Sequence, residues 1–325
     1  MKHVYRLLAL TLFLAFAAGL VQAQTTLRLA HVVTEDSNHH ILSVHFQEAL
    51  ERLSDGQIEV EIFCCGQLGA GERELIELVQ FGEIDVFAGS TGTVPGFVPV
   101  VNVFDLPFLF RDNDHVDSVL DGPIGREILD EFEQAGLKGL AFAENGWRNL
   151  TNARRPVLGA EDASGLRLRT MENPVHLDAW SALGVNATPM SWGEVRSALQ
   201  QGVIDGQENP INIIYSFELW EVQDYLTVTR HVFSPSVLIM NLDTFNAFSS
   251  EEQAWILDAA MEASQAERAW IRDNEEEMLV EIEGRMDVVR EPDMASFREA
   301  MAPVFEKYEE RFGADLIQAI IDEGR

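Results

Sequence analysis

The chain has 325 residues, of which 54 are acidic and 23 basic, giving a formal net charge of −31. This length is enough for two domains of ordinary size, and 46% hydrophobic residues is typical of a water-soluble globular protein. Nucleic-acid binding requires a basic surface, so the strong acidity argues against a nucleic-acid partner.

The N-terminus has the pattern of a secretory signal peptide. Lys2 and Arg6 precede an apolar run over residues 7–20, and small residues around Ala23 offer a cleavage site before Gln24. The run is too short for a membrane span and ends at a cleavage-like site. We therefore expect residues 1–23 to be a signal peptide and the mature protein to be exported.

The two cysteines, Cys64 and Cys65, are adjacent in the chain. Consecutive Cα atoms lie about 3.8 Å apart, which is less than the usual disulfide span of about 4.4–6.8 Å. The sequence favours two small thiols packed at a strand end over a strained vicinal disulfide. No further metal ligand lies nearby in the sequence, so these residues do not predict a metal site.

The first part of the chain alternates predicted strands and helices. Strands are predicted at residues 26–32, 57–63 and 84–88, and helices at residues 39–54 and 72–81. This alternation predicts an α/β domain with a largely parallel sheet. Ligands of open α/β sheets bind at the carboxyl ends of the strands.

Ser90 follows one of these strands in a motif that approaches a nucleophile elbow. Ala88 replaces the first glycine of that motif, and Pro95 interrupts the helix that should follow. We therefore reject Ser90 as a nucleophile and retain it as a hydroxyl donor to a ligand. The glycine-rich loop at residues 66–71 also lacks the spacing of a nucleotide-binding loop.

A crossing between domains is predicted near residues 145–149, which follow a predicted strand at residues 139–144. The segment reads as a turn followed by Trp147 and Arg148. Arg148 could line a pocket, or it could stack on or pair with a neighbouring side chain.

Residues 166–210 contain the strongest candidate binding residues. Alternation places Arg167 and Arg169 on one face of a strand over residues 166–171, and Asn209 is stiffened by the following Pro210. A guanidinium held at a strand end can clamp a carboxylate through two parallel hydrogen bonds, and an asparagine amide can support it. The alternative is that Arg169 forms an ordinary ion pair with one of the many acids.

Further along, Ser191 and Glu194 have the spacing of a capping box, so a helix is predicted to start there and run to Gln200. Trp192 lies at the start of this helix and could belong to the core or form a wall of a ligand site.

The C-terminal third contains a long predicted helix. Ser249 and Glu252 form another capping box, and the helical pattern continues to about residue 286. At 1.5 Å per residue such a helix could reach roughly 50 Å, which is longer than one small domain needs. We expect it to span both domains. The remaining elements are strands at residues 225–229, 236–241 and 288–290, and helices at residues 293–312 and 314–321.

Three motifs follow one another in order: Gly165-Leu-Arg-Leu-Arg-Thr-Met-Glu-Asn-Pro, Asn186-Ala-Thr-Pro-Met-Ser-Trp-Gly-Glu-Val and Gln201-Gly-Val-Ile-Asp-Gly-Gln-Glu-Asn-Pro. With Phe63-Cys-Cys-Gly-Gln-Leu-Gly and Phe104-Asp-Leu-Pro-Phe-Leu-Phe, they make the mature chain resemble the solute-binding proteins of tripartite ATP-independent periplasmic (TRAP) transporters, of the dicarboxylate-binding type.

This resemblance implies an α/β periplasmic-binding-protein fold of two domains around a hinged cleft, with one long helix spanning both. We predict domain I over residues 24–146 and about 235–274. Domain II is predicted over residues 147–234 and about 275–325.

The resemblance also implies a function. The protein is expected to capture a small organic acid in the periplasm, such as a sugar acid, another hydroxy acid or a zwitterionic carboxylate. It would deliver this ligand to a membrane permease, and we expect a monomer that is not an enzyme. The predicted ligand-binding residues, in decreasing order of support, are Arg169, Asn209, Arg148, Glu172, Trp192, Ser90 and His31.

Glu172 would suit hydroxyl or ammonium groups of the ligand and would repel a second carboxylate. Family members that bind oxo-acids through a metal carry a Glu-Trp pair after the region of Asn209. Here Pro210, Ile211 and Asn212 follow instead, so we expect no metal and no cofactor.

Two other functions remain open from the sequence. One is an exported hydrolase that uses Ser90 or a pair of carboxylates, although the histidines at positions 31, 39, 40 and 45 show no recognisable relay or metal-ligand spacing. The other is a periplasmic sensor or peptide-binding module that uses the same cleft.

Overall fold

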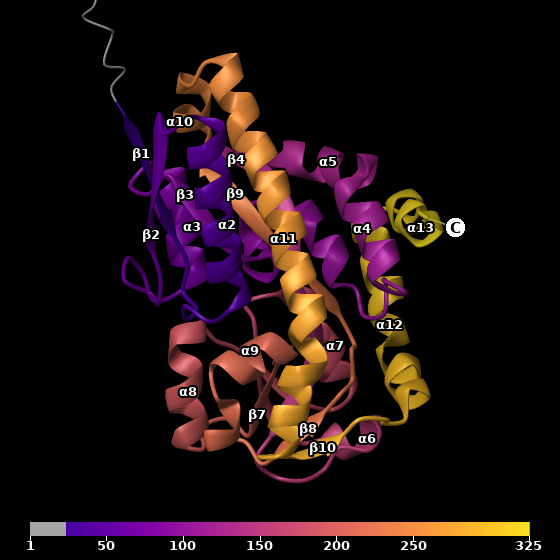
Figure 1. The fold of residues 1–325 in the computed structure, drawn as a ribbon. Coiled ribbons are helices and arrows are strands. Elements are labelled where there is room, and N and C mark those ends of the chain that lie inside the picture. The colour runs from indigo at the N-terminus through magenta and orange to yellow at the C-terminus, as the bar shows by residue number, and fades with distance from the viewer. Residues whose placement is uncertain (1–23, 325) are drawn as a thin grey trace, which may run out of the picture.

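The computed structural model describes residues 24–324, so the expected signal peptide lies outside the described residues. One hydrogen-bonded path joins the strands in the order β2-β1-β3-β9-β4-β7-β5-β6, with β8 and β10 attached beside β4. Helices flank these strands, and Figure 1 shows an upper part and a lower part of the molecule. The expected α/β class is confirmed. None of the described helices is long and apolar enough to cross a membrane.

The upper part contains the first strands of the chain. β1 pairs in parallel with β2 and β3, and β9 runs antiparallel to β3. The alternation over residues 58–61 is matched by alternating burial, as expected for an edge strand. The elements here are β1 (Thr25–Ala30), α2 (Asn38–Leu53), β2 (Ile58–Phe63), α3 (Glu72–Gln80), β3 (Val86–Ser90), β9 (Phe233–Asn241) and α10 (Leu242–Ala247).

A run of short helices follows β3 and packs against β9 and β4. Its aromatic and aliphatic residues, including Phe104, Leu106 and Phe110, are buried. The elements are η1 (Thr91–Gly96), η2 (Pro99–Asp105), α4 (Asn113–Asp121), α5 (Pro123–Asp130) and η3 (Glu131–Ala135).

The turn predicted before Trp147 and Arg148 is absent. One strand, β4 (Leu137–Asn152), runs through this segment without ending. It pairs with β9 as far as Trp147 and with β7 from Arg148 onward, so it enters both parts of the molecule. The backbone bends at a register shift beside Gly146, whose φ of +123° is open to glycine. Glycine therefore marks a bulge in a continuous strand.

The lower part is built around β5 and its neighbours. β5 pairs in parallel with β6 and β7, and the Asn173 side chain caps α7 with Pro174 at its first turn. The elements are β5 (Arg167–Thr170), α6 (Ala160–Ala163), α7 (Pro174–Ala182), β6 (Asn186–Pro189), α8 (Trp192–Gln200), β7 (Gly206–Pro210), α9 (Ile211–Ser216), η4 (Leu219–Glu221), β8 (Tyr225–Thr227) and β10 (Asp287–Val289).

The long helix α11 (Ser250–Glu283) runs along both parts, as Figure 1 shows. Its predicted capping box between Ser249 and Glu252 is present. Ile256 and Ala260 belong to the apolar core of the upper part, and Met278 and Ile282 belong to that of the lower part. Burial at both ends therefore ties the two parts to one rigid element.

The C-terminal helices also contact both parts. α12 (Met294–Phe312) packs on α7, where Tyr308 donates a hydrogen bond to Asp178. α13 (Ala314–Asp322) returns to the upper part, where Arg111 donates to the carbonyl of Ile321. The predicted domain boundaries place all of this segment in domain II, and those boundaries remain a prediction.

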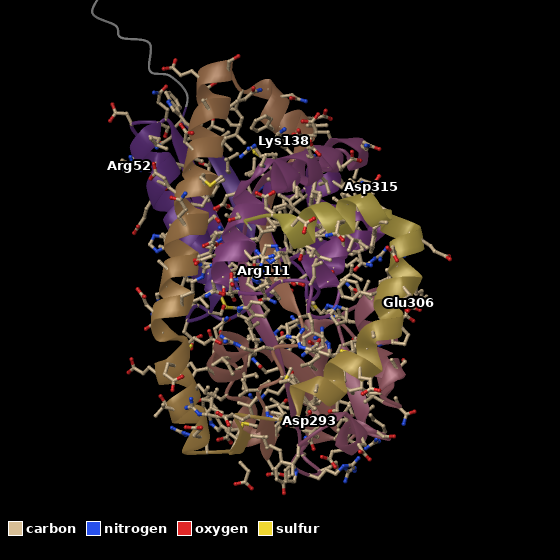
Figure 2. The ribbon with its side chains drawn as sticks, turned by 90° about the vertical axis from the view of Figure 1, so that its right-hand side faces the viewer. Arg52, Arg111, Lys138, Asp293, Glu306 and Asp315 are labelled. Atoms are coloured by element: carbon tan, nitrogen blue, oxygen red, sulfur yellow. A yellow bond between two sulfur atoms is a disulfide. The ribbon has the colours of Figure 1, made fainter. Side chains whose placement is uncertain are left out.

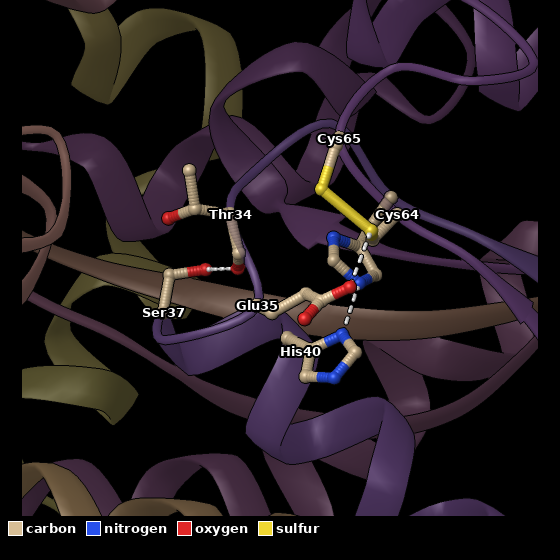
Figure 3. Close-up of a disulfide and its surroundings, with 7 residues drawn as sticks. Thr34, Glu35, Ser37, His40, Cys64 and Cys65 are labelled. Carbon is tan, nitrogen blue, oxygen red and sulfur yellow. Dashed lines mark hydrogen bonds between the residues drawn. A yellow bond between two sulfur atoms is a disulfide. The ribbon is translucent and has the colours of Figure 1, made fainter.

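Cys64 and Cys65 are joined by a disulfide, which corrects the expectation of two thiols. Cys65 has a φ of +61°, a left-handed turn that brings the two adjacent side chains to the same side of the chain. Figure 3 shows the bond beside Glu35 and His40, with the Cys64 sulfur 3.7 Å from a Glu35 carboxylate oxygen.

Candidate functional site

A closed cavity of about 30 Å³ lies where the upper and lower parts meet. Its apolar walls are Val32, Val33, Met171 and Ile213. Its polar walls come from seven separate segments of the chain: His39, Glu72, Ser90, Asn145, Arg169, Trp192 and Asn209. Side chains far apart in sequence are therefore brought together around one small space.

Arg169 is the cation of this cavity. Its side chain is buried, and its Nε donates a hydrogen bond of 2.8 Å to the carbonyl of Met190. Among the described residues, no hydrogen bond or ion pair occupies its two terminal nitrogens. Burial, followed by the charge of Arg148, lowers the pKa of Arg169 to about 10. The group is still charged at neutral pH, so the cavity holds a buried guanidinium with free donors.

Trp192 forms the wall beside this guanidinium. The Arg169 Cζ lies 5.5 Å from the centre of the Trp192 ring, within the range of a cation–π contact. The Trp192 ring also packs edge-on against Phe217, which holds it in place. The residue thus serves as both core and cavity wall.

Asn209 and Ser90 also line the cavity. The Asn209 amide donates to Gln207, which leaves its oxygen and one N–H for other partners. The Ser90 hydroxyl lies 3.2 Å from that of Ser234 and accepts a hydrogen bond from the Gly92 amide. Ser90 therefore caps the following helix as well as facing the cavity.

Glu72 and His39 are cavity residues that the sequence analysis missed. Glu72 accepts hydrogen bonds from the Ser90 amide at 2.9 Å and from the Thr93 hydroxyl at 3.3 Å. Burial raises its pKa. His39 is fully enclosed, and burial lowers its pKa to about 3. Its Nδ1 has no hydrogen-bond partner among the described residues and lies 3.9 Å from the Glu72 carboxylate.

Arg148 does not line the cavity. Its guanidinium binds the Glu208 carboxylate at two points and also donates to the Glu208 carbonyl. His231 and His176 approach the same carboxylate at 3.2 and 3.6 Å. Although burial alone would raise it, the charge of Arg148 holds the pKa of Glu208 well below its ordinary value.

The hydrogen bonds around Arg148 and Glu208 lie outside the cavity, next to its lining residue Asn209 on β7. His176 also contacts Asp105 at 3.0 Å, and the Asn173 amide donates to the same carboxylate. These bonds join β4, β7, α7 and η2, so they fix the strand that carries Asn209. One Arg148 nitrogen, Nη1, has no hydrogen-bond partner among the described residues.

Two other predicted residues lie outside the cavity. Glu172 is exposed and acts on Arg169 only through its charge. His31 is buried and its ring contacts that of His40, with 3.1 Å between Nε2 and Nδ1. The predicted capping box at Ser191 is also incomplete, because its hydroxyl donates to the Glu194 side chain and does not accept a hydrogen bond from a helix amide.

The described residues contain no cluster of three or more His, Cys, Asp or Glu side chains placed to hold a metal ion. Among the described residues, the Ser90 hydroxyl contacts another serine, a methionine sulfur and a backbone amide, and none of these partners is a histidine. The geometry of the described residues therefore gives no support to a serine-hydrolase relay.

Comparison with known proteins gives a consistent result. The family model for bacterial extracellular solute-binding proteins, family 7, matches residues 29–311. A solute-binding protein of Verminephrobacter eiseniae is 40% identical over 299 residues, which cover 92% of this chain and 89% of that protein.

Solved structures agree with this match. A TRAP periplasmic solute-binding protein from Polaromonas sp. JS666, bound to D-erythronate, is similar with a TM-score of 0.91 and 40% identity, covering 93% of this chain and all of that one. A sugar-acid-binding protein from Advenella mimigardefordensis, in complex with galactonate, has a TM-score of 0.88 and 34% identity, covering 92% and 97% of the two chains.

Proposed function

Because this chain belongs to family 7 of the bacterial extracellular solute-binding proteins, we propose that it captures a small polyhydroxy monocarboxylate and delivers it to a TRAP permease. The observation that carries the proposal is the buried Arg169 guanidinium, whose terminal nitrogens face the closed cavity without a protein acid bound to them. The similar proteins of known structure bind D-erythronate and galactonate.

The carboxylate of the ligand binds Arg169 through the two terminal nitrogens. A planar guanidinium matches a carboxylate with two parallel, charge-assisted hydrogen bonds. The Trp192 ring packs beside the guanidinium, and the Met190 carbonyl accepts a hydrogen bond from its Nε. The guanidinium is therefore oriented before the ligand binds. Asn209 supports the carboxylate from β7.

The hydroxyl groups of the ligand face the opposite wall. Glu72 accepts hydrogen bonds, and the unpartnered Nδ1 of His39 lies beside it. Neutral His39 and the Asn145 amide can each accept or donate, which suits hydroxyls. A second carboxylate at this wall would be repelled by Glu72 when that group is ionised. This repulsion favours the binding of a hydroxy monocarboxylate over that of a dicarboxylate.

Capture requires the two parts to open and close. A cavity of about 30 Å³ has room for little more than a water molecule, so a ligand of several carbons enters only when the parts separate. Closure around the ligand excludes water and strengthens the bond to Arg169. The closed, monomeric form is then the one that docks on the membrane permease.

Titration calorimetry of the mature protein with D-erythronate and with galactonate tests the proposal. Arg169→Ala should weaken binding roughly 100-fold or more, because it removes one partner of a buried charge pair. The matched control is Arg167→Gln, two residues away on β5. Arg167 binds Asp205, which Arg154 also holds, so this variant changes the charge without touching the cavity.

The control should bind as the unmodified protein does. Unchanged affinity in Arg169→Ala would show that the carboxylate binds elsewhere. Turnover of the ligand during the titration would instead support an exported enzyme.

A further inference from the structure

A second and much larger hollow lies on another face of the molecule. This groove has a volume of about 790 Å³ and is bordered by the segment before α4, the end of β8 and the start of α12. It shares no lining residue with the closed cavity. Figure 2 views the face of α12 and α13, where Arg111 lies above Asp293. A volume of this size is typical of small-molecule sites.

The floor of the groove is aromatic. Phe110 and Trp147 are buried to 4% and 7% exposure, and Phe108 is partly buried. The Trp147 Nε1 donates to the Asn113 side chain at 2.8 Å, so its polar edge is already satisfied. Phe110 and Trp147 both pack edge-on against Phe233. These contacts fix the rings of the floor, and the Arg230 Cζ lies 5.7 Å from the centre of the Trp147 ring.

The rim of the groove is rich in arginine: Arg111, Arg230, Arg290 and Arg298. Two of them have acidic partners, since Arg230 binds Glu275 and Arg290 binds Glu276 and Glu283.

The other two rim arginines lack such partners among the described residues. Arg111 donates only to the carbonyls of Ile321 and Glu323. Arg298 packs 4.3 Å above the Phe108 ring and makes no ion pair. Among the described residues Arg111 and Arg298 therefore have no carboxylate bound to them, which leaves their charges available to an external anion.

Acidic side chains limit the charge of that anion. Asp112, Asp114 and Glu291 also line the groove, and Asp112 is already engaged with the His115 amide at 2.8 Å. A ligand with several negative charges would meet these carboxylates. A single negative charge on an aromatic body would instead place the charge at Arg298 and the rings on the floor.

We propose that this groove is a second binding site, separate from the closed cavity, for an amphiphilic aromatic monoanion such as an arylsulfonate or aryl carboxylate. The ring of the ligand packs against Phe108 and Trp147. Its acid group pairs with Arg298. Because the walls come from β4, from the segment after β8 and from the start of α12, an occupant contacts both parts of the molecule at once.

Fluorescence titration of the mature protein with 8-anilinonaphthalene-1-sulfonate tests this site, with N-phenyl-1-naphthylamine as the uncharged counterpart. The sulfonate should bind with a single saturable site. Arg298→Gln should raise its dissociation constant roughly threefold to fivefold, the effect expected for an exposed ion pair, and should leave the uncharged probe unaffected.

Arg311→Gln is the matched control. Arg311 lies on the same helix, is exposed, and packs against Phe312 outside the groove, so this variant should bind the sulfonate as before. Equal weakening by both substitutions would overturn the proposal, because it would indicate attraction to general surface charge. Loss of sulfonate binding in Arg169→Gln would overturn it too, since the probe would then occupy the closed cavity.

Discussion

Arg148 and Glu208 form a two-point ion pair in which neither side chain exposes surface to solvent. A buried pair of this kind adds little net stability, but removing one partner leaves a charge without compensation. Glu208→Gln keeps the shape of the side chain and removes its charge. We expect the free energy of unfolding to fall by about 3–5 kcal/mol, as measured by urea denaturation followed by circular dichroism.

An exposed pair provides the comparison for this prediction. Glu281 and Arg285 are about half-exposed neighbours on α11 and at its end, so Glu281→Gln should cost at most about 1 kcal/mol. Similar losses in the two variants would mean that the buried pair is held by its hydrogen-bonded neighbours and not by its charge.

Glu72 sets the proposed preference for hydroxyl groups over a second carboxylate. Glu72→Gln should weaken D-erythronate binding roughly tenfold, because a hydrogen bond to a charged group is lost. It should also improve succinate binding, because the repulsion disappears. Calorimetry with both ligands measures the change in selectivity. Glu74→Gln, on the exposed side of the same helix turn, should change neither affinity.

The placement of Arg169 and Asn209 at one cavity could be predicted from sequence because its evidence is local. Alternation along a strand placed Arg169 at the carboxyl end of β5, and Pro210 marked Asn209 at the end of β7. The structure brings both to one cavity. Glu72 and His39 carried no comparable signal, because an acid in the first turn of α3 is the ordinary companion of a helix dipole. Only the tertiary fold brings them to the cavity.

Long-range pairing explains the other differences. The sequence leaves open whether Arg148 lines a pocket or pairs with a neighbouring side chain, because its partner Glu208 lies 60 positions away in the chain. Two residues so far apart in the chain share no local pattern that would indicate their contact. At Gly146, a glycine next to an asparagine is typical of a turn, yet β9 and β7 supply hydrogen-bonding partners on both sides and the strand continues.

Glu144 predicts how stability changes with pH. Burial raises its pKa from 4.5 to about 7, although Arg272 opposes the shift. Between these values the folded protein keeps the proton and the unfolded chain loses it. The stabilising contribution is therefore complete below about pH 4.5 and is lost as pH rises through 7. A shift of this size corresponds to at most roughly 3 kcal/mol.

Urea denaturation at about pH 5 and about pH 7 measures this effect. Glu144→Gln should reduce the loss of stability between the two pH values, because the side chain no longer titrates. Burial also raises the pKa of Glu267. Part of the dependence of stability on pH will therefore remain in this variant. Glu277→Gln, exposed on α11, should retain the full slope. A Glu144→Gln slope equal to that of the unmodified protein would contradict the assignment.

The disulfide between Cys64 and Cys65 is expected to be present in the exported protein and to matter little for stability. Native protein treated with iodoacetamide should remain unlabelled in mass spectrometry, and prior treatment with a dithiol reductant should expose both sulfurs. Because the bond closes a loop of only two residues, it removes little entropy from the unfolded chain. The double substitution of both cysteines by serine should therefore cost about 1 kcal/mol or less.

Labelling without reductant would show free thiols, as the sequence alone favoured. A much larger cost in the double variant would mean that the bond holds the neighbouring loop, where the Cys65 amide donates to the Val33 carbonyl at the edge of the cavity.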